Sequence, residues 1–191
     1  MSQTTAPTRQ VDGRTVPAAG PWVVDPSHSS IEFVARHLVV TKVRGRFTDW
    51  SAELVIGERP EDSRVEVTIG AGSIDTGDAG RNGHLVSPDF LDVERFPTLT
   101  FTTTSVSPGP GDRWDVRGDL TIHGVTRPVT LAVEFAGAGS DPWGNTKAGF
   151  SASTEIDRED FGLTWNQALE TGGVLVGKQV RIEIEVQAVQ G

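Results

Sequence analysis

The sequence predicts an all-β domain, a single antiparallel up-and-down β-barrel of about eight strands with one or two short helical insertions. Apolar and polar residues alternate with a period of two along most of the chain, as in strands with one buried and one solvated face. The 22 Gly and 11 Pro residues supply turns between these segments. A two-layer sandwich would also bury the apolar faces. Two longer interruptions, 76–92 and 158–176, favour a barrel whose ends need covers.

The expected strands follow the alternation in order along the chain. The pattern is clearest in 180–186, where aliphatic residues alternate with Arg181, Glu183 and Glu185. Pro128 stands at the start of another expected strand, where its missing N–H group is tolerated. The same alternation marks 31–35, 65–69, 99–103, 129–135 and 150–156. The expected strands are 22–25, 29–38, 45–57, 63–71, 97–106, 113–123, 125–137, 146–157 and 178–189.

Composition excludes several classes of protein. The 17 basic and 26 acidic residues give a net charge of -9, which argues against a nucleic-acid binder and against docking on anionic lipid. The chain has no cysteine, so it has no disulfide, thiolate metal site or Cys nucleophile. The four histidines form no His-x-His or His-x-x-x-His pair, so we expect structural roles for them and no metal site.

The first 20 residues differ from the rest of the chain. They are rich in Thr, Gln, Ala, Pro and Gly and contain no long apolar run. We therefore predict a flexible tail over 1–20 and one barrel domain over 21–191. The absence of a signal sequence and of a long apolar segment leads us to expect a cytoplasmic protein, although a leader already removed would leave the same sequence.

A series of short motifs has a specific order and spacing. The motifs are Asp25-Pro26-Ser27-His28-Ser29, Phe33 with Arg36-His37-Leu38, Val43-Arg44-Gly45-Arg46-Phe47, Ser73-Ile74-Asp75-Thr76, the 81–97 loop ending in Glu94-Arg95-Phe96-Pro97, Gly118-Asp119-Leu120-Thr121-Ile122-His123-Gly124-Val125-Thr126, Asp157-Arg158-Glu159-Asp160-Phe161-Gly162-Leu163, and Trp165. Together they resemble the YceI-like family, lipocalin-like barrels that bind polyisoprenoids, from about Trp22 to Ala188. The resemblance implies an extended barrel around a long isoprenoid chain, without a metal or redox cofactor, and a homodimer. Many bacterial relatives are periplasmic.

We therefore expect a non-catalytic carrier that holds a long-chain polyisoprenoid, either an isoprenoid quinone or a polyprenyl lipid, in an apolar lumen. Burial of such a tail yields about 0.8 kcal/mol per carbon unit, so tail length is selected only where a closed end excludes longer tails. Each lumen candidate taken alone is equally consistent with an ordinary packed core. The candidates all occupy the apolar positions of the period-two alternation. They are Ile31, Phe33, Leu54, Val67, Ile69, Leu99, Phe101, Leu120, Ile122, Leu131, Val133, Phe135, Phe150, Ile182 and Ile184.

The polar loop 81–92 is the candidate for the cavity mouth. Arg81 and His84 are candidate head-group ligands, because Arg binds anions through two donors and His both donates and accepts. Either residue is also consistent with anchoring the loop. Asp89 and Asp92 are alternatively helix caps around Pro88.

Three further interpretations concern the ends of the barrel. Leu85, Phe90 and Trp165 are candidates for the apolar wall of the mouth, and Trp143 is a further candidate there. The segment 157–160 is interpreted as a salt-bridged corner. One alternative to a carrier is an enzyme that acts on an apolar isoprenoid-type substrate through His84, Asp89 and Arg81, although no nucleophile elbow accompanies these residues. The other alternative is a structural domain with a solid core.

Overall fold

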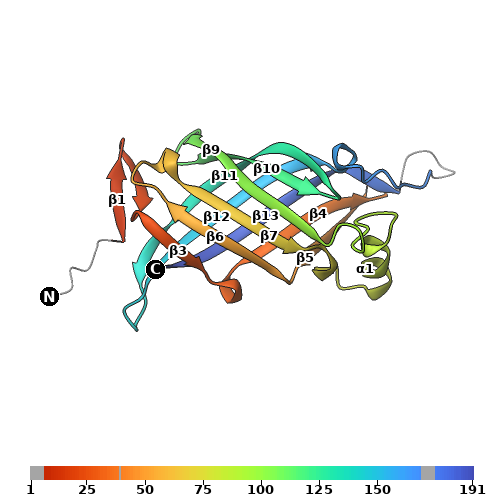
Figure 1. Ribbon diagram of the computed structural model, residues 1–191, viewed down its shortest axis with the longest axis horizontal. Helices are drawn as coiled ribbons and strands as arrows, with labels where there is room; N and C mark the ends of the chain where they lie inside the picture. The colour runs from red at the N-terminus through yellow and green to blue at the C-terminus, as the bar shows by residue number, and fades with distance from the viewer. Residues whose placement is uncertain (1–6, 39, 169–174) are drawn as a thin grey trace.

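The computed structural model describes residues 7–38, 40–168 and 175–191. Figure 1 shows an elongated barrel with β1 and the C-terminus toward one end and α1 at the other. The prediction of a closed antiparallel barrel is confirmed. The strands are β1 (Thr8–Val11), β2 (Arg14–Pro17), β3 (Gly20–Val24), β4 (Ser30–His37), β5 (Thr41–Phe47), β6 (Trp50–Ile56), β7 (Arg64–Gly70), β8 (Ile74–Asp75), β9 (Thr98–Pro108), β10 (Trp114–Ile122), β11 (Val125–Ser140), β12 (Thr146–Asp157) and β13 (Val176–Gln190).

At three places around the barrel, two short strands lie end to end where one long strand would otherwise run. β13 pairs antiparallel with β3 near its own end and with β4 nearer its start, so β3 and β4 run in the same direction. In the same way β5 and β6 pair with β4 and β3, and β8 and β7 pair with β5 and β6. Strands β9 to β13 then follow as a meander, and β13 closes the ring. The predicted strand 45–57 is therefore wrong as one element, because the chain breaks pairing between Phe47 and Trp50.

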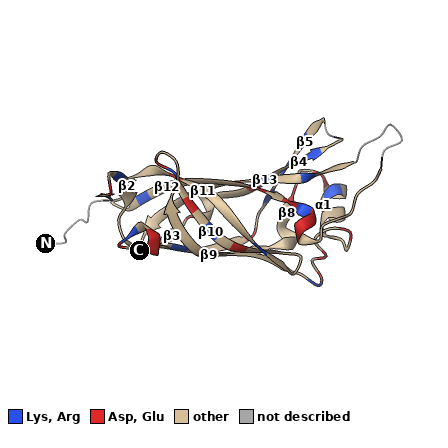
Figure 2. Cartoon of the chain, turned by 90° about the horizontal axis from the view of Figure 1, so that it is seen from above, with Lys and Arg blue, Asp and Glu red and all other residues tan. Residues whose placement is uncertain are grey.

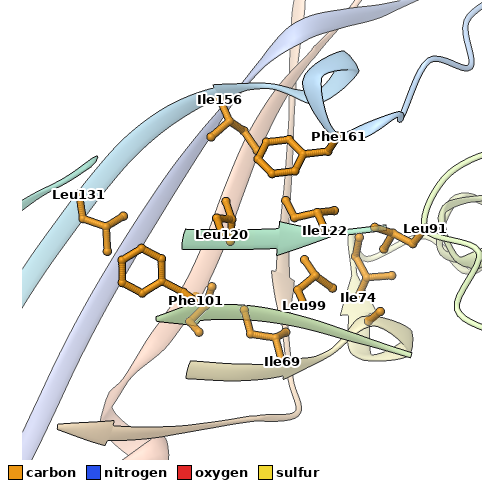
Figure 3. Close-up of a cluster of buried hydrophobic side chains, with 12 residues drawn as sticks. Ile69, Ile74, Leu91, Leu99, Phe101, Leu120, Ile122, Leu131, Ile156 and Phe161 are labelled. Carbon is orange, nitrogen blue, oxygen red and sulfur yellow. The ribbon is translucent and has the colours of Figure 1, made fainter. Parts of the chain in front are cut away.

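The alternation determines which residues face the inside. Leu131 of β11 is buried, whereas the neighbouring Thr130 is exposed. On β13, Arg181 and Glu183 pair with each other outside the barrel at 2.9 Å, and Ile182 lies opposite Phe33 of β4. The prediction that Leu131 of β11 and Ile182 of β13 face the inside of the barrel is confirmed. Figure 3 shows inward-pointing side chains from several strands gathered inside the barrel.

The prediction of a flexible tail over 1–20 is wrong for the described residues 7–20. There β1 and β2 form a hairpin across one end of the barrel. Asp12 and Gly13 both have positive φ, the turn geometry that an Asp-Gly pair favours between antiparallel strands. Arg9 donates to the carbonyls of Gly57 and Glu58. Arg14 donates to the carbonyls of Gly109 and Arg113, so its side chain ties the hairpin to the β9–β10 turn.

The predicted insertion 76–92 contains one short helix, α1 (Ala79–Val86), as expected. Its N-cap is Asp78, whose carboxylate accepts from the Arg81 amide at 2.7 Å. The suggestion that Asp89 or Asp92 caps it is wrong, because those residues follow its last turn. No helix in the described ranges is long and apolar enough to cross a membrane.

The short 3₁₀ helices are η1 (Pro26–His28), η2 (Pro60–Asp62), η3 (Ala71–Ser73) and η4 (Arg158–Phe161). In the chain, η1 lies between β3 and β4, and η3 lies between β7 and β8. The second predicted insertion, 158–176, begins with η4. Its residues 169–174 lie outside the described residues.

Two phenylalanine rings lie against glycines of neighbouring strands. A Cβ atom at Gly118 of β10 would overlap the ring of Phe101 on β9, and one at Gly45 of β5 would overlap the ring of Phe33 on β4. Both rings therefore lie flat on the inner wall instead of extending across the lumen. Glycine weakens a strand intrinsically, but here its missing side chain leaves room for a ring.

We expect Gly118→Val to destabilise the barrel by roughly 1–3 kcal/mol, because the new side chain displaces the Phe101 ring in a packed wall. Urea denaturation measures this change. The matched control is Gly139→Val, since a Cβ at Gly139 of β11 meets nothing within 4 Å. Equal free energies of unfolding for the two variants would contradict the role given to Gly118.

Candidate functional site

An apolar cavity of about 350 Å³ extends inside the barrel. This volume lies in the range of about 300–1,000 Å³ that is usual for small-molecule sites. Every residue predicted to face the lumen lies in its wall. Their contact with a ligand stays a prediction, but the interior contains space that a solid core would fill.

The two ends of the cavity are built from different parts of the chain. At the hairpin end the wall includes Val16, Pro17 and Trp114. Val16 and Pro17 were missed by sequence reasoning, because 1–20 was predicted as a tail. At the α1 end the wall includes Leu85 and Phe90, two of the residues predicted for the apolar mouth.

A ring cluster covers the α1 end of the cavity. The ring of His84 meets that of Phe90 edge-on at 5.0 Å and that of Trp165 edge-on at 4.6 Å between centroids. His84 Nε2 also lies 3.0 Å from a carboxylate oxygen of Asp89. Phe90 lies in the cavity wall, whereas His84 and Trp165 pack behind it. The structure therefore brings together three of the residues predicted for the mouth.

Arg81 lies apart from this cluster. Its Nε donates to the Thr76 hydroxyl at 2.8 Å and its Nη2 to the Thr76 carbonyl at 3.0 Å. The side chain of Asn82 accepts from the Thr76 amide at 2.8 Å. These bonds connect the start of α1 to the end of β8, the loop-anchoring alternative that the sequence left open. Asp92, buried beside the loop, pairs with Arg95 at 3.3 Å.

Arg158 is buried, with 3 % of its surface exposed, and lies in the cavity wall. Its guanidinium donates to backbone carbonyls: to Trp165 at 2.9 Å, to Gly177 at 3.0 Å, to Val176 at 3.4 Å and to Leu163. Burial lowers the pKa of Arg158. The predicted salt-bridged corner is wrong for this residue.

The neighbouring Glu159 forms the ion pair instead, with Lys178 of β13 at 2.7 Å. Arg158 therefore joins the 163–165 segment to the start of β13 through neutral acceptors. This arrangement also fixes the backbone of Trp165 behind the ring cluster.

An exposed cluster on η1 resembles a catalytic triad in composition only. Asp25 and the hydroxyl of Ser27 both lie 2.9 Å from the same nitrogen, Nδ1 of His28, so no relay runs from Asp through His to Ser. Hydrogen bonds from Ser27 and His28 lower the pKa of Asp25 to about 2. Asp25 accepts from the Ser27 amide at 3.0 Å as the cap of η1, which gives the cluster a structural role.

The other predicted positions have simpler surroundings. Trp143 is 82 % exposed on the β11–β12 turn at the hairpin end, so its predicted place at the mouth is wrong. His123 packs on the ring of Phe96 at 4.6 Å. Among the residues that the structure describes, no three His, Asp or Glu side chains gather as a metal site.

We expect Arg158→Leu to destabilise the protein by about 3 kcal/mol or more, because it leaves several buried carbonyls without a donor. Arg158→Lys should recover only part of the loss, since an ammonium has fewer donors in a less suitable geometry. Chemical denaturation measures both. Arg59→Leu is the control, since Arg59 is exposed and pairs with Asp62, and it should change stability little. An effect of Arg158→Leu as small as that of the control would contradict this account.

The chain is similar to a family of known proteins. The model of the YceI-like domain matches residues 22–188. A UPF0312 protein of Pseudomonas aeruginosa is 43% identical over 71% of this chain and 71% of its own length. Protein YceI of Salmonella newport is 39% identical over 85% of this chain and 82% of its own length.

Solved structures have the same fold. BcnA of Burkholderia cenocepacia has a TM-score of 0.75 at 25% identity and covers 86% of this chain and 98% of its own. A polyisoprenoid binding domain from Saccharophagus degradans has a TM-score of 0.62 at 15% identity and covers 91% of this chain and 100% of its own. From the matched residues and the shared barrel, the chain belongs to the YceI-like family.

Proposed function

We propose that this protein is a non-catalytic carrier that binds a long-chain isoprenoid lipid or isoprenoid quinone inside its barrel. The observation that carries the proposal is the apolar cavity of about 350 Å³, whose wall includes Phe101, Leu131 and Ile182. The polyisoprenoid binding domain among the structural neighbours supports the ligand class. The proposal includes no resident cofactor.

The cavity wall suits a hydrocarbon tail for a simple energetic reason. Each buried carbon unit contributes about 0.8 kcal/mol, whereas a polar group buried without a partner costs free energy. The hairpin end closes the cavity with Val16 and Pro17. A tail that enters from the α1 end would reach this wall, so the ligand should have an upper limit of length.

The head group belongs at the α1 end in this proposal. Nε2 of His84 is bonded to Asp89, and no other described residue bonds to its Nδ1. Because the carboxylate of Asp89 accepts the proton on Nε2, Nδ1 has a lone pair and could accept from a prenol or hydroquinone hydroxyl at the mouth. Arg81, which is bonded to Thr76, is assigned to the loop instead.

The alternative of an enzyme lacks a comparable observation. His84 and Asp89 contact each other, but no described hydroxyl bonds to the His84 ring, and the Ser87 hydroxyl donates to the His84 backbone carbonyl at 2.7 Å instead. The hydroxyl of Ser27 lies on the surface at η1, where its contacts are those of a capping cluster. The geometry therefore favours binding over catalysis.

We expect Leu131→Asp and Ile182→Asp to abolish retention of isoprenoid, because an unpaired carboxylate in the apolar cavity is costly. Mass spectrometry of an organic extract of the purified protein measures the bound lipid. Circular dichroism establishes that each variant is folded. Thr130→Asp, one residue away on the outer face of β11, is the control and should retain the lipid. Full retention by a folded Leu131→Asp variant would remove this position from the site.

We expect His84→Ala to weaken binding of an intact ligand roughly fivefold, the effect of about 1 kcal/mol from one hydrogen bond. A hydrocarbon of equal length without the head group should bind to His84→Ala and wild type alike. Arg81→Ala, which loosens the loop, should affect both ligands equally. Titrations followed by tryptophan fluorescence measure these affinities. Equal losses of both ligands in His84→Ala would show that the ring cluster only shapes the mouth.

A further inference from the structure

The turn between β4 and β5 exposes apolar side chains at the α1 end of the barrel. We define the β4–β5 tip as the described residues 36–38 and 40–42. Val40 is 84% exposed and Leu38 is 39% exposed, two of the few large apolar side chains on the described surface. Figure 2 shows the ends of β4 and β5 rising clear of the body of the barrel near α1. These apolar groups therefore lie on a projection.

Basic residues surround these apolar groups. Arg36 of β4 lies opposite Lys42 of β5, and Val34 lies opposite Arg44, so the cations share the outer face of the two strands. Arg181 of β13 lies opposite Val34 on the same face. Figure 2 shows basic residues on this projection.

Acidic residues lie among these cations. Glu183 accepts from Arg44 at 3.2 Å and from Arg181 at 2.9 Å, so one carboxylate serves two guanidinium groups. Arg46, further from the tip, pairs with Asp75 at 3.7 Å. Glu32 lies opposite Arg46 and Glu155 lies opposite Arg181, so acids and bases are interspersed along this face. Only its outermost pair, Arg36 and Lys42, is wholly basic, on a chain whose net charge is -9.

The inner face of the same strands is continuous with the cavity. Phe33 and Ala35 of β4 lie in the cavity wall, and so do Val176 and Val180 of β13 beside them. The two strand faces thus place a basic surface outside, the cavity inside and exposed apolar side chains at the end. A ligand leaving the barrel here would pass beside the tip.

We propose that the β4–β5 tip docks on the surface of a membrane that contains anionic lipid. Leu38 and Val40 enter the interface between head groups and acyl chains, while Lys42 and its basic neighbours contact lipid phosphates. The inference rests on the proposed function, because an isoprenoid tail is too apolar to exchange through water and is exchanged at a bilayer. The net charge argued against such docking, but it averages over the chain and conceals this local cluster.

The opposite end of the barrel does not have the same combination. Trp143 is 82% exposed there, but its backbone amide donates to Asp141, whose carboxylate pairs with Lys147 at 3.7 Å. This residue therefore provides a control: a large exposed apolar side chain on a turn whose neighbouring charges balance each other. A surface that bound lipid through apolar exposure alone would use both ends.

The test measures binding of the full chain to vesicles of equal parts phosphatidylglycerol and phosphatidylcholine by co-sedimentation. The double variant Leu38→Asp/Val40→Asp should lose about tenfold or more in vesicle affinity. Asp also tolerates the left-handed backbone at position 38, where φ is 54°. Lys42→Glu should weaken binding most at low ionic strength, because salt screens exposed charges. Trp143→Asp should stay within about twofold of wild type.

Several results would overturn the proposal. These are no vesicle binding by wild type, unchanged binding by the double variant, or an equal loss in Trp143→Asp. Sedimentation velocity of the double variant distinguishes a further case: loss of a dimer without loss of vesicle binding would assign the tip to a second copy of the chain.

Isoprenoid added from organic solvent separates this inference from the proposed function. A double variant that retains such lipid but no longer binds vesicles supports both, whereas a wild type that binds vesicles but no lipid refutes only the carrier function.

Discussion

Closure of the backbone hydrogen-bond ring by β13 is the constraint on which the rest of the molecule depends. β13 pairs with β12 on one side and with β3 and β4 on the other, so the barrel has no open edge along this strand. A closed ring satisfies its backbone groups between neighbouring strands, so the interior does not need to contain a dense core. The flat positions of Phe33 and Phe101 against Gly45 and Gly118 use this freedom to line the wall without filling the lumen.

The ends of the ring, where strand pairing stops, need separate solutions, and the chain uses arginine at both. Arg9 and Arg14 join the β1–β2 hairpin to turn carbonyls at one end. Arg158 joins the 163–165 segment to β13 at the other. In each case a planar guanidinium with several donors bonds two or more backbone carbonyls at once, which a lysine could not do equally well.

Period-two alternation was sufficient to predict the barrel and the inward parity of Leu131 and Ile182, because parity is a property of each strand by itself. The hairpin was missed because its strands are short and its signal was only the Asp12-Gly13 pair within a polar segment. The carbonyl partners of Arg158 were also outside the reach of sequence reasoning. They depend on where the β13 backbone lies, and the adjacent acids suggested an ion pair that Glu159 forms instead.

The difference between the two ends gives the cavity a direction. At the hairpin end, Val16 is buried behind side-chain bonds from two arginines, so opening would break several interactions together. At the α1 end, Arg158 holds the Trp165 backbone, but the rings of Phe90, His84 and Trp165 meet only through two edge-on contacts and one tilted contact, which can separate without breaking the Arg158 bonds. An apolar tail would therefore enter beside the ring cluster and stop at Val16. A wall of this kind excludes tails that are too long but discriminates weakly among shorter ones, because each missing carbon unit removes only about 0.8 kcal/mol.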